Sequence, residues 1–154
     1  MSRSRAMLLV LAGLCGASAA AGTVEVMGTG GSVCQPTTPV DAALVAYHDG
    51  AATAAHGPAS VSCALVASMP GHRQVGAAVM FASDTRDWTK SRCVFFNAFP
   101  SRSLEVRVVG IPGREHIGVA EFPADKAGFA AASAVCTLRP QQKLYGIDAY
   151  LEPH

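Results

Sequence analysis

Four cysteines, located after an apparent export leader, constrain this chain more than any other feature. Cys34, Cys63, Cys93 and Cys136 all lie beyond the first 21 residues. An export leader implies an oxidising compartment, and an even number of cysteines in such a compartment indicates disulfides. We therefore expect a small exported domain, secreted or periplasmic, that two disulfides stabilise.

The first 21 residues have the three parts of a cleaved signal peptide. Arg3 and Arg5 make a positive start, residues 6–14 form an uncharged apolar run, and small residues up to Ala21 fit the cleavage pattern. The run is far shorter than the roughly 20 residues that span a bilayer, so stable membrane insertion is not expected. Cys15 offers a lipid-anchored alternative, although the residue before it is not the small one that such signals carry.

Length and charge limit the kind of domain that the mature chain can form. Of 154 residues, 133 remain after cleavage, which suits one domain. We expect residues 22–33 to be a flexible N-terminal lead-in and residues 34–154 to form a single domain. Removing two arginines leaves ten Lys and Arg against eleven Asp and Glu, with no basic stripe. A nucleic-acid partner is therefore not expected.

Apolar residues alternate with polar ones in several short runs, which is typical of half-buried strands. Glycine- and proline-containing turns separate these runs at about ten-residue spacing, which predicts an all-β fold. We expect an antiparallel β-sandwich, jelly-roll-like, of about eight strands. Residues 124–135 are rich in alanine and could instead contain a short helix. The eight predicted strands lie near residues 43–48, 60–65, 75–81, 93–95, 104–108, 117–122, 134–138 and 145–151.

Spacing favours disulfides over a metal site for the four cysteines. Structural zinc sites need cysteines in close pairs, whereas the nearest two of these four, Cys34 and Cys63, are 29 residues apart. Three connectivities are open to four cysteines. We favour Cys34–Cys63, which would attach the N-terminal arm to an early strand, and Cys93–Cys136, which would join two core strands.

Residues 84–90 are the most charged segment and contain the only tryptophan. Trp88 could provide a stacking surface for a sugar, with Asp84, Arg86 and Asp87 as hydrogen-bonding groups. Asp84 and Asp87 could alternatively bind calcium, although two carboxylates are few for such a site. A third interpretation is a polar hairpin loop in which Trp88 folds back over the end of the sandwich.

No arrangement of residues predicts catalysis, a metal site or a cofactor. The histidines show no metal-binding spacing, and neither a nucleophile elbow nor a phosphate loop is present. Acids that converge only in the fold, such as Asp84, Asp87 and Glu121, would support a hydrolase. Arg114, in a Pro-Gly-Arg-Glu turn, would suit a protease inhibitor if the turn were a reactive loop. The other arginines, Arg102, Arg107 and Arg139, are expected at solvated strand and turn positions.

Three cysteine-containing segments carry a resemblance. Residues 61–65 (VSCAL) are similar to a V-x-C-P-L segment, residues 91–95 (SRCVF) to an S-x-C pattern, and residues 136–140 (CTLRP) to C-T-L-P-P. Together they resemble a diffuse group of small uncharacterised secreted bacterial proteins. Ala64 and Arg139 stand where that group has proline. The resemblance implies a secreted, disulfide-bonded, mostly β domain and no particular activity.

The expected function is therefore non-catalytic. We expect an exported binding protein or an envelope or matrix component, with an extracellular glycan as one candidate partner. An extracytoplasmic hydrolase of glycans or other polymers is the alternative.

Overall fold

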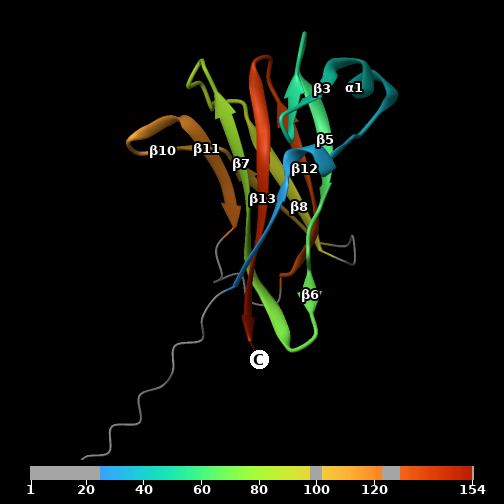
Figure 1. The fold of residues 1–154 in the computed structure, drawn as a ribbon, viewed down its shortest axis with the longest axis vertical. Coiled ribbons are helices and arrows are strands. Elements are labelled where there is room, and N and C mark those ends of the chain that lie inside the picture. The colour runs from blue at the N-terminus through green and yellow to red at the C-terminus, as the bar shows by residue number, and fades with distance from the viewer. Residues whose placement is uncertain (1–24, 98–101, 123–128, 154) are drawn as a thin grey trace, which may run out of the picture.

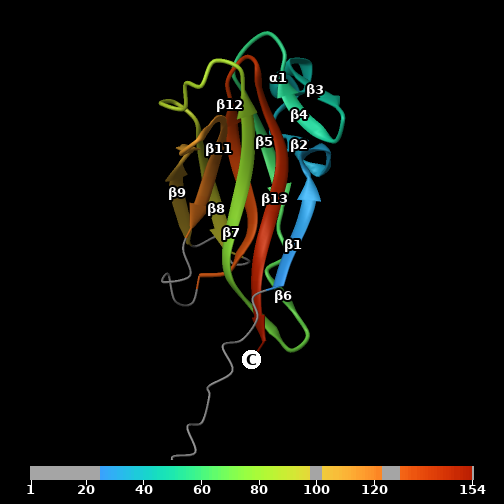
Figure 2. The ribbon, with the colours of Figure 1, turned by 60° about the vertical axis from the view of Figure 1, so that its left-hand side comes forward.

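The chain forms a β-sandwich of two antiparallel sheets (Figures 1 and 2). A computed structural model describes residues 25–97, 102–122 and 129–153. The expected leader, residues 1–21, lies outside the described residues. The all-β, disulfide-stabilised sandwich predicted from the alternating runs is confirmed.

The larger sheet has eight strands in the order β10-β11-β7-β13-β4-β3, with β1 added to β13 and β6 added to β7. Its centre is the pair β7 and β13, the two longest strands. The strand bounds are β1 (Glu25–Gly30), β3 (Val45–His48), β4 (Ala51–Ala54), β6 (Ser68–Met69), β7 (His72–Ser83), β10 (Val109–Ile111), β11 (Arg114–Phe122) and β13 (Gln142–Pro153).

The smaller sheet has five strands in the order β2-β5-β12-β8-β9. Their bounds are β2 (Gln35–Pro36), β5 (Ala59–Ala64), β8 (Arg92–Asn97), β9 (Ser103–Arg107) and β12 (Ala131–Leu138). One helical turn, η1 (Gly31–Val33), and one short helix, α1 (Pro39–Leu44), complete the described chain. Helix α1 begins where Thr38 accepts a hydrogen bond from the backbone N–H of Asp41 at 3.1 Å, with proline at the first helical position.

The core lies between the sheets and consists of the inward residues of the alternating strands. Phe81, Phe95 and Phe122 are almost fully buried, and the rings of Phe95 and Phe122 meet edge to face with centroids 5.1 Å apart. Many other core positions are alanine or valine, which lets the two sheets approach closely. Burial of this apolar surface is the main stabilising term for the sandwich.

Two β-bulges change which residues of the central strands face the core. Leu144 pairs with Phe81 and Gly146 pairs with Met80, so Tyr145 is the extra residue in β13. Regular alternation over the predicted strand 145–151 would place Tyr145 on the inward face, but the fully buried residue is Leu144. A second bulge, at Val75, likewise turns the neighbouring Gln74 inward.

Both disulfides connect neighbouring segments of the smaller sheet. Cys93 of β8 and Cys136 of β12 are direct partners in the ladder, with Cα atoms 4.1 Å apart. Cys34, immediately before β2, is joined to Cys63 of β5. These are the two pairs favoured from the sequence, and all four half-cystines are fully buried.

Three segments differ from their sequence-based expectation. The described part of the expected lead-in, residues 25–33, forms β1 and η1, because its backbone extends the larger sheet by pairing with β13. The expected strand over residues 43–48 begins in α1 and is a strand only from Val45. Of the alanine-rich segment 124–135, residues 124–128 lie outside the described chain and residues 131–135 are strand, where they pair with both β5 and β8.

The described chain begins and ends at the same end of the sandwich. Glu25 pairs with Leu151 of β13, two residues before the last described position. At the other end of β13, Gln142 pairs with Ser83, the last residue of β7. The loop after Ser83 therefore lies at the end of the sandwich opposite to the first and last described residues (Figure 1).

Candidate functional site

The loop of residues 84–91 connects β7 of the larger sheet to β8 of the smaller sheet. It contains all four residues that the sequence offered as ligand contacts, Asp84, Arg86, Asp87 and Trp88. Three surface hollows are lined by residues of this loop. The loop is therefore the strongest candidate for a binding site.

Trp88 folds back onto the sandwich. Only 9% of its surface is exposed, and its indole packs over two glycines of the β10–β11 hairpin. A Cβ atom on Gly118 would lie 2.8 Å from the indole, and one on Gly110 would lie 3.1 Å from it. The indole N–H donates to the carbonyl of Glu115 at 3.4 Å. Trp88 thus belongs to the core rather than forming an open stacking platform.

Asp87 has its hydrogen-bonding capacity taken up by neighbours. One carboxylate oxygen accepts from the hydroxyl of Thr89 at 2.7 Å and from its backbone N–H at 3.0 Å. The other oxygen is in an ion pair with Arg139. The Thr89 hydrogen bonds, followed by Arg139, lower the pKa of Asp87 to about 2. Asp87 therefore stays ionised and fixes the loop.

The buried side chain of Gln142 also holds the loop of residues 84–91 in place. Its side-chain oxygen accepts from the hydroxyl of Ser91 and from the backbone N–H of Arg139, both at 2.9 Å. Its amide nitrogen donates to the carbonyl of Asp87 at 3.1 Å. Gln142 and Ser91 are each 1% exposed, so water has little access to replace these bonds. The loop is thereby joined to the β12–β13 turn.

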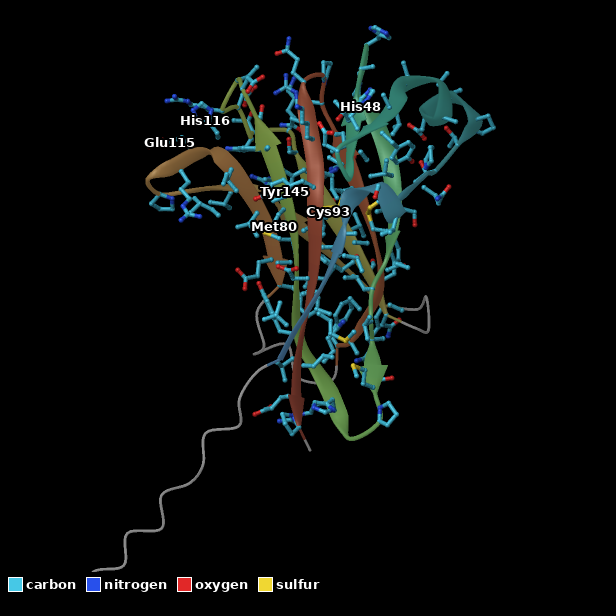
Figure 3. The ribbon with its side chains drawn as sticks, in the orientation of Figure 1. His48, Met80, Cys93, Glu115, His116 and Tyr145 are labelled. Atoms are coloured by element: carbon cyan, nitrogen blue, oxygen red, sulfur yellow. A yellow bond between two sulfur atoms is a disulfide. The ribbon has the colours of Figure 1, made fainter. Side chains whose placement is uncertain are left out.

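Arg86 connects the loop to the β10–β11 hairpin. Its guanidinium donates to Nε2 of His116 at 3.1 Å, and its backbone has a φ of +56°. Because a guanidinium can only donate, Nε2 of His116 is the acceptor. Glu115 and His116 lie on this hairpin, which projects to the left of the sandwich in Figure 3.

Three hollows surround the loop. The first, of about 390 Å³, is lined by Lys90, Arg92 and Arg107, by Glu105 and by hydroxyl-bearing residues. The second, of about 530 Å³, is lined by Trp88 and residues 107–110. These two hollows adjoin at Thr89 and Arg107, which line both of them, and together they are called here the 89/107 groove. The third, of about 290 Å³, lies beside the Asp87–Arg139 ion pair.

The cations of the 89/107 groove were not recognised as a group from the sequence. Arg107 was expected at a solvated strand position, and it is indeed exposed on β9. The pairing of β8 with β9 places it directly opposite Arg92. Both residues occupy outward positions of their strands, and this much could be predicted from the alternation in the sequence. That they lie opposite each other depends on the register between β8 and β9, which cannot be read from the sequence.

The carboxylates proposed for hydrolysis are not brought together. Glu121 pairs with Ala78 of β7, five residues before β7 ends at Ser83. At about 3.3 Å per strand residue this separation is roughly 16 Å. Asp87 already has its ion pair with Arg139. Among the described residues, no group of three His, Cys, Asp or Glu side chains is placed to hold a metal ion.

Arg114, considered as an inhibitor residue, belongs to a tight hairpin turn. It pairs with Ile111 across Pro112-Gly113, and Gly113 has a φ of +75°. This is a common type of β-turn, in which proline precedes a residue with positive φ. Arg114 is therefore held within the β10–β11 ladder rather than presented on an extended loop.

The fold and these hollows define a small disulfide-bonded β-sandwich with an open polar groove at one end. Comparison with protein-family models, with curated proteins and with solved structures gives no match. No helix in the described ranges has the length and apolar character needed to cross a bilayer. The groove itself is therefore the basis for considering function.

Proposed function

We propose that the chain is an exported, non-catalytic binding protein whose ligand is an extracellular glycan held in the 89/107 groove. The observation that carries this proposal is that the two larger hollows adjoin each other, since Thr89 and Arg107 line both of them. Volumes of about 390 and 530 Å³ lie in the range of small-ligand sites.

The chemistry of the groove favours a polar ligand. Hydroxyl and cationic side chains line the first hollow, including Thr89, Thr137 and Lys90. The second adds an apolar wall, of which Val109 is the exposed part and Trp88 the buried base. Hydrogen-bonding groups beside a limited apolar wall suit a carbohydrate, which has many hydroxyls and some exposed C–H surface. A purely apolar ligand would leave the polar groups of the groove without partners.

The groove is also held in shape before any ligand arrives. Gln142 and Asp87 fix the loop through hydrogen bonds and an ion pair, and Trp88 seats it on the core. A preformed site loses less conformational entropy on binding than a mobile one. This supports a binding role for the groove.

Export is supported by the cysteines together with the leader sequence. Two buried disulfides within one sheet are typical of proteins that fold in an oxidising compartment. The signal-peptide pattern in residues 1–21 gives the route.

Isothermal titration against a panel of neutral and acidic polysaccharides tests the proposal on the oxidised protein. Two matched exposed valines provide the variants: Val109, 63% exposed beside the groove, and Val40, 71% exposed on α1. Val109→Glu should weaken binding at least about tenfold, a loss of about 1.4 kcal/mol. Val40→Glu should leave it unchanged. Absence of binding to every polymer, or equal binding by both variants, would overturn the proposal.

A further inference from the structure

Arg92 and Arg107 are direct partners in the ladder between β8 and β9, on the outward face of the smaller sheet. Directly opposed residues have Cβ atoms about 5 Å apart, and like charges at such positions are destabilising. Both side chains are exposed and line the first hollow of the 89/107 groove. Lys90 lines the same hollow, so three cations converge there.

The negative charge beside these cations does not balance them. Glu105 is the one acid that lines the hollow, and its carboxylate lies 3.4 Å from the guanidinium of Arg92. Neither Lys90 nor Arg107 has an ion-pair partner among residues 25–97, 102–122 and 129–153. The whole chain has a formal charge of only +1. The excess of two positive charges in this hollow is therefore a local feature and does not reflect the net charge of the whole chain.

The row of outward residues extends beyond the two arginines. Arg92 pairs on its other side with Thr137 of β12, and Thr137 pairs with Ser60 of β5. Four hydrogen-bonding side chains, one on each of four neighbouring strands, thus form a row across the sheet. With strands about 4.8 Å apart, the row is roughly 14 Å long. A chain-like ligand can contact such a row along its length, whereas a single inorganic anion would contact only the cationic end.

From these observations we infer that the glycan bound by the 89/107 groove is acidic, and that Lys90, Arg92 and Arg107 hold its carboxylate or sulfate group. This inference rests on the proposed function and adds the chemical class of its ligand. The hydroxyls of Thr137 and Ser60 then bond the neighbouring sugar along the row. Guanidinium groups suit this role because their planar fork can donate two parallel hydrogen bonds to a pair of carboxylate or sulfate oxygens.

Titration of the oxidised protein with polygalacturonate, dextran sulfate and neutral dextran tests the inference. The site variant is Arg92→Gln with Arg107→Gln. The control is Arg73→Gln with Arg114→Gln, which removes the same charge from an ion pair with Glu152 and from the tip of a hairpin. Charge-assisted hydrogen bonds each contribute about 1.5 kcal/mol or more, equivalent to about tenfold in affinity.

We expect at least one acidic polymer to bind the wild-type protein, with an affinity that decreases as salt is added. Its affinity should be at least about tenfold lower for the site variant and within about twofold of wild type for the control variant. A preference between polygalacturonate and dextran sulfate identifies the acidic group. Binding of neutral dextran that the site variant leaves intact would overturn the inference while the proposed function stands. Binding of no polymer would overturn both.

Folding of the site variant is checked by its thermal midpoint. Arg92 and Arg107 are exposed, so their replacement should leave this midpoint nearly unchanged. Lys90→Gln alone provides a second variant that leaves the β8–β9 pair intact. An unchanged affinity in that variant for the acidic polymer would contradict the convergence of three cations on one group.

Discussion

The hydrogen bonds of Gln142 predict how strongly the candidate site depends on one buried side chain. Gln142→Met keeps a similar volume but removes the partner of the Ser91 hydroxyl, the Arg139 N–H and the Asp87 carbonyl. The Ser91 hydroxyl is fully buried, so leaving it unpaired costs about 1–3 kcal/mol. The two backbone groups are nearer to solvent, and each loss costs about 0.5–1.5 kcal/mol. We expect the free energy of unfolding to fall by about 3 kcal/mol.

Urea unfolding monitored by the fluorescence of the single tryptophan measures this change, because Trp88 sits in the loop that Gln142 holds. A double-mutant cycle with Ser91→Ala separates the hydrogen bond from packing. Once Ser91 is alanine, no buried hydroxyl is left unpaired, so Gln142→Met should cost about 1 kcal/mol less than in the wild type. A loss below about 1 kcal/mol in the single variant, or strict additivity in the cycle, would refute the proposed anchoring.

Three further perturbations test other parts of the structure. Gly31→Ala should lower the free energy of unfolding in urea by about 3 kcal/mol, since the added Cβ would lie 1.9 Å from the carbonyl oxygen of Leu144. Gly146→Ala should cost about 1 kcal/mol or less, because its Cβ would meet the flexible end of Met80. Equal losses in the two variants would contradict this reasoning. Replacing both cysteines of the β8–β12 disulfide by alanine, which opens a connection with a sequence separation of 43 residues, should cost about 4 kcal/mol by the chain-entropy argument, and an unchanged urea midpoint would contradict it. The pKa of Asp87 is depressed, so the stability it contributes should be complete above its ordinary pKa near 3.8 and disappear as pH falls towards 2. Asp87→Asn should remove this part of the acid sensitivity, and identical urea midpoints for variant and wild type at pH 6 would show that the ionised carboxylate adds nothing.

The long strands were predictable because each shows its own alternation. Val61 and Cys63 of β5 face the core just as their spacing suggests, and so do Leu138 and Cys136 of β12. The five strands that were not predicted, β1, β2, β4, β6 and β10, have two to six residues each. They exist because a neighbouring strand offers a partner, and such partners are distant in the sequence.

The two bulges show a second limit of prediction from the sequence, which concerns the face that each residue presents. Alternation assigns a face to Tyr145 only if the strand is regular, and one extra residue moves Leu144 into the core instead. The candidate site has the same dependence on pairing. Its loop was recognised from composition, with Trp88 as the central residue. The opposition of Arg92 and Arg107 depends entirely on the β8–β9 register.

The position of the first and last described residues has a consequence for how the protein can be displayed. Glu25 and the last strand residues meet at one end of the sandwich, and the loop of residues 84–91 lies at the other. Strand β13 spans the distance with 12 residues, about 36 Å at the usual rise. Any support joined beyond Pro153, whether a sensor chip or a fusion partner, would therefore hold the groove outward, free to meet a large polymer.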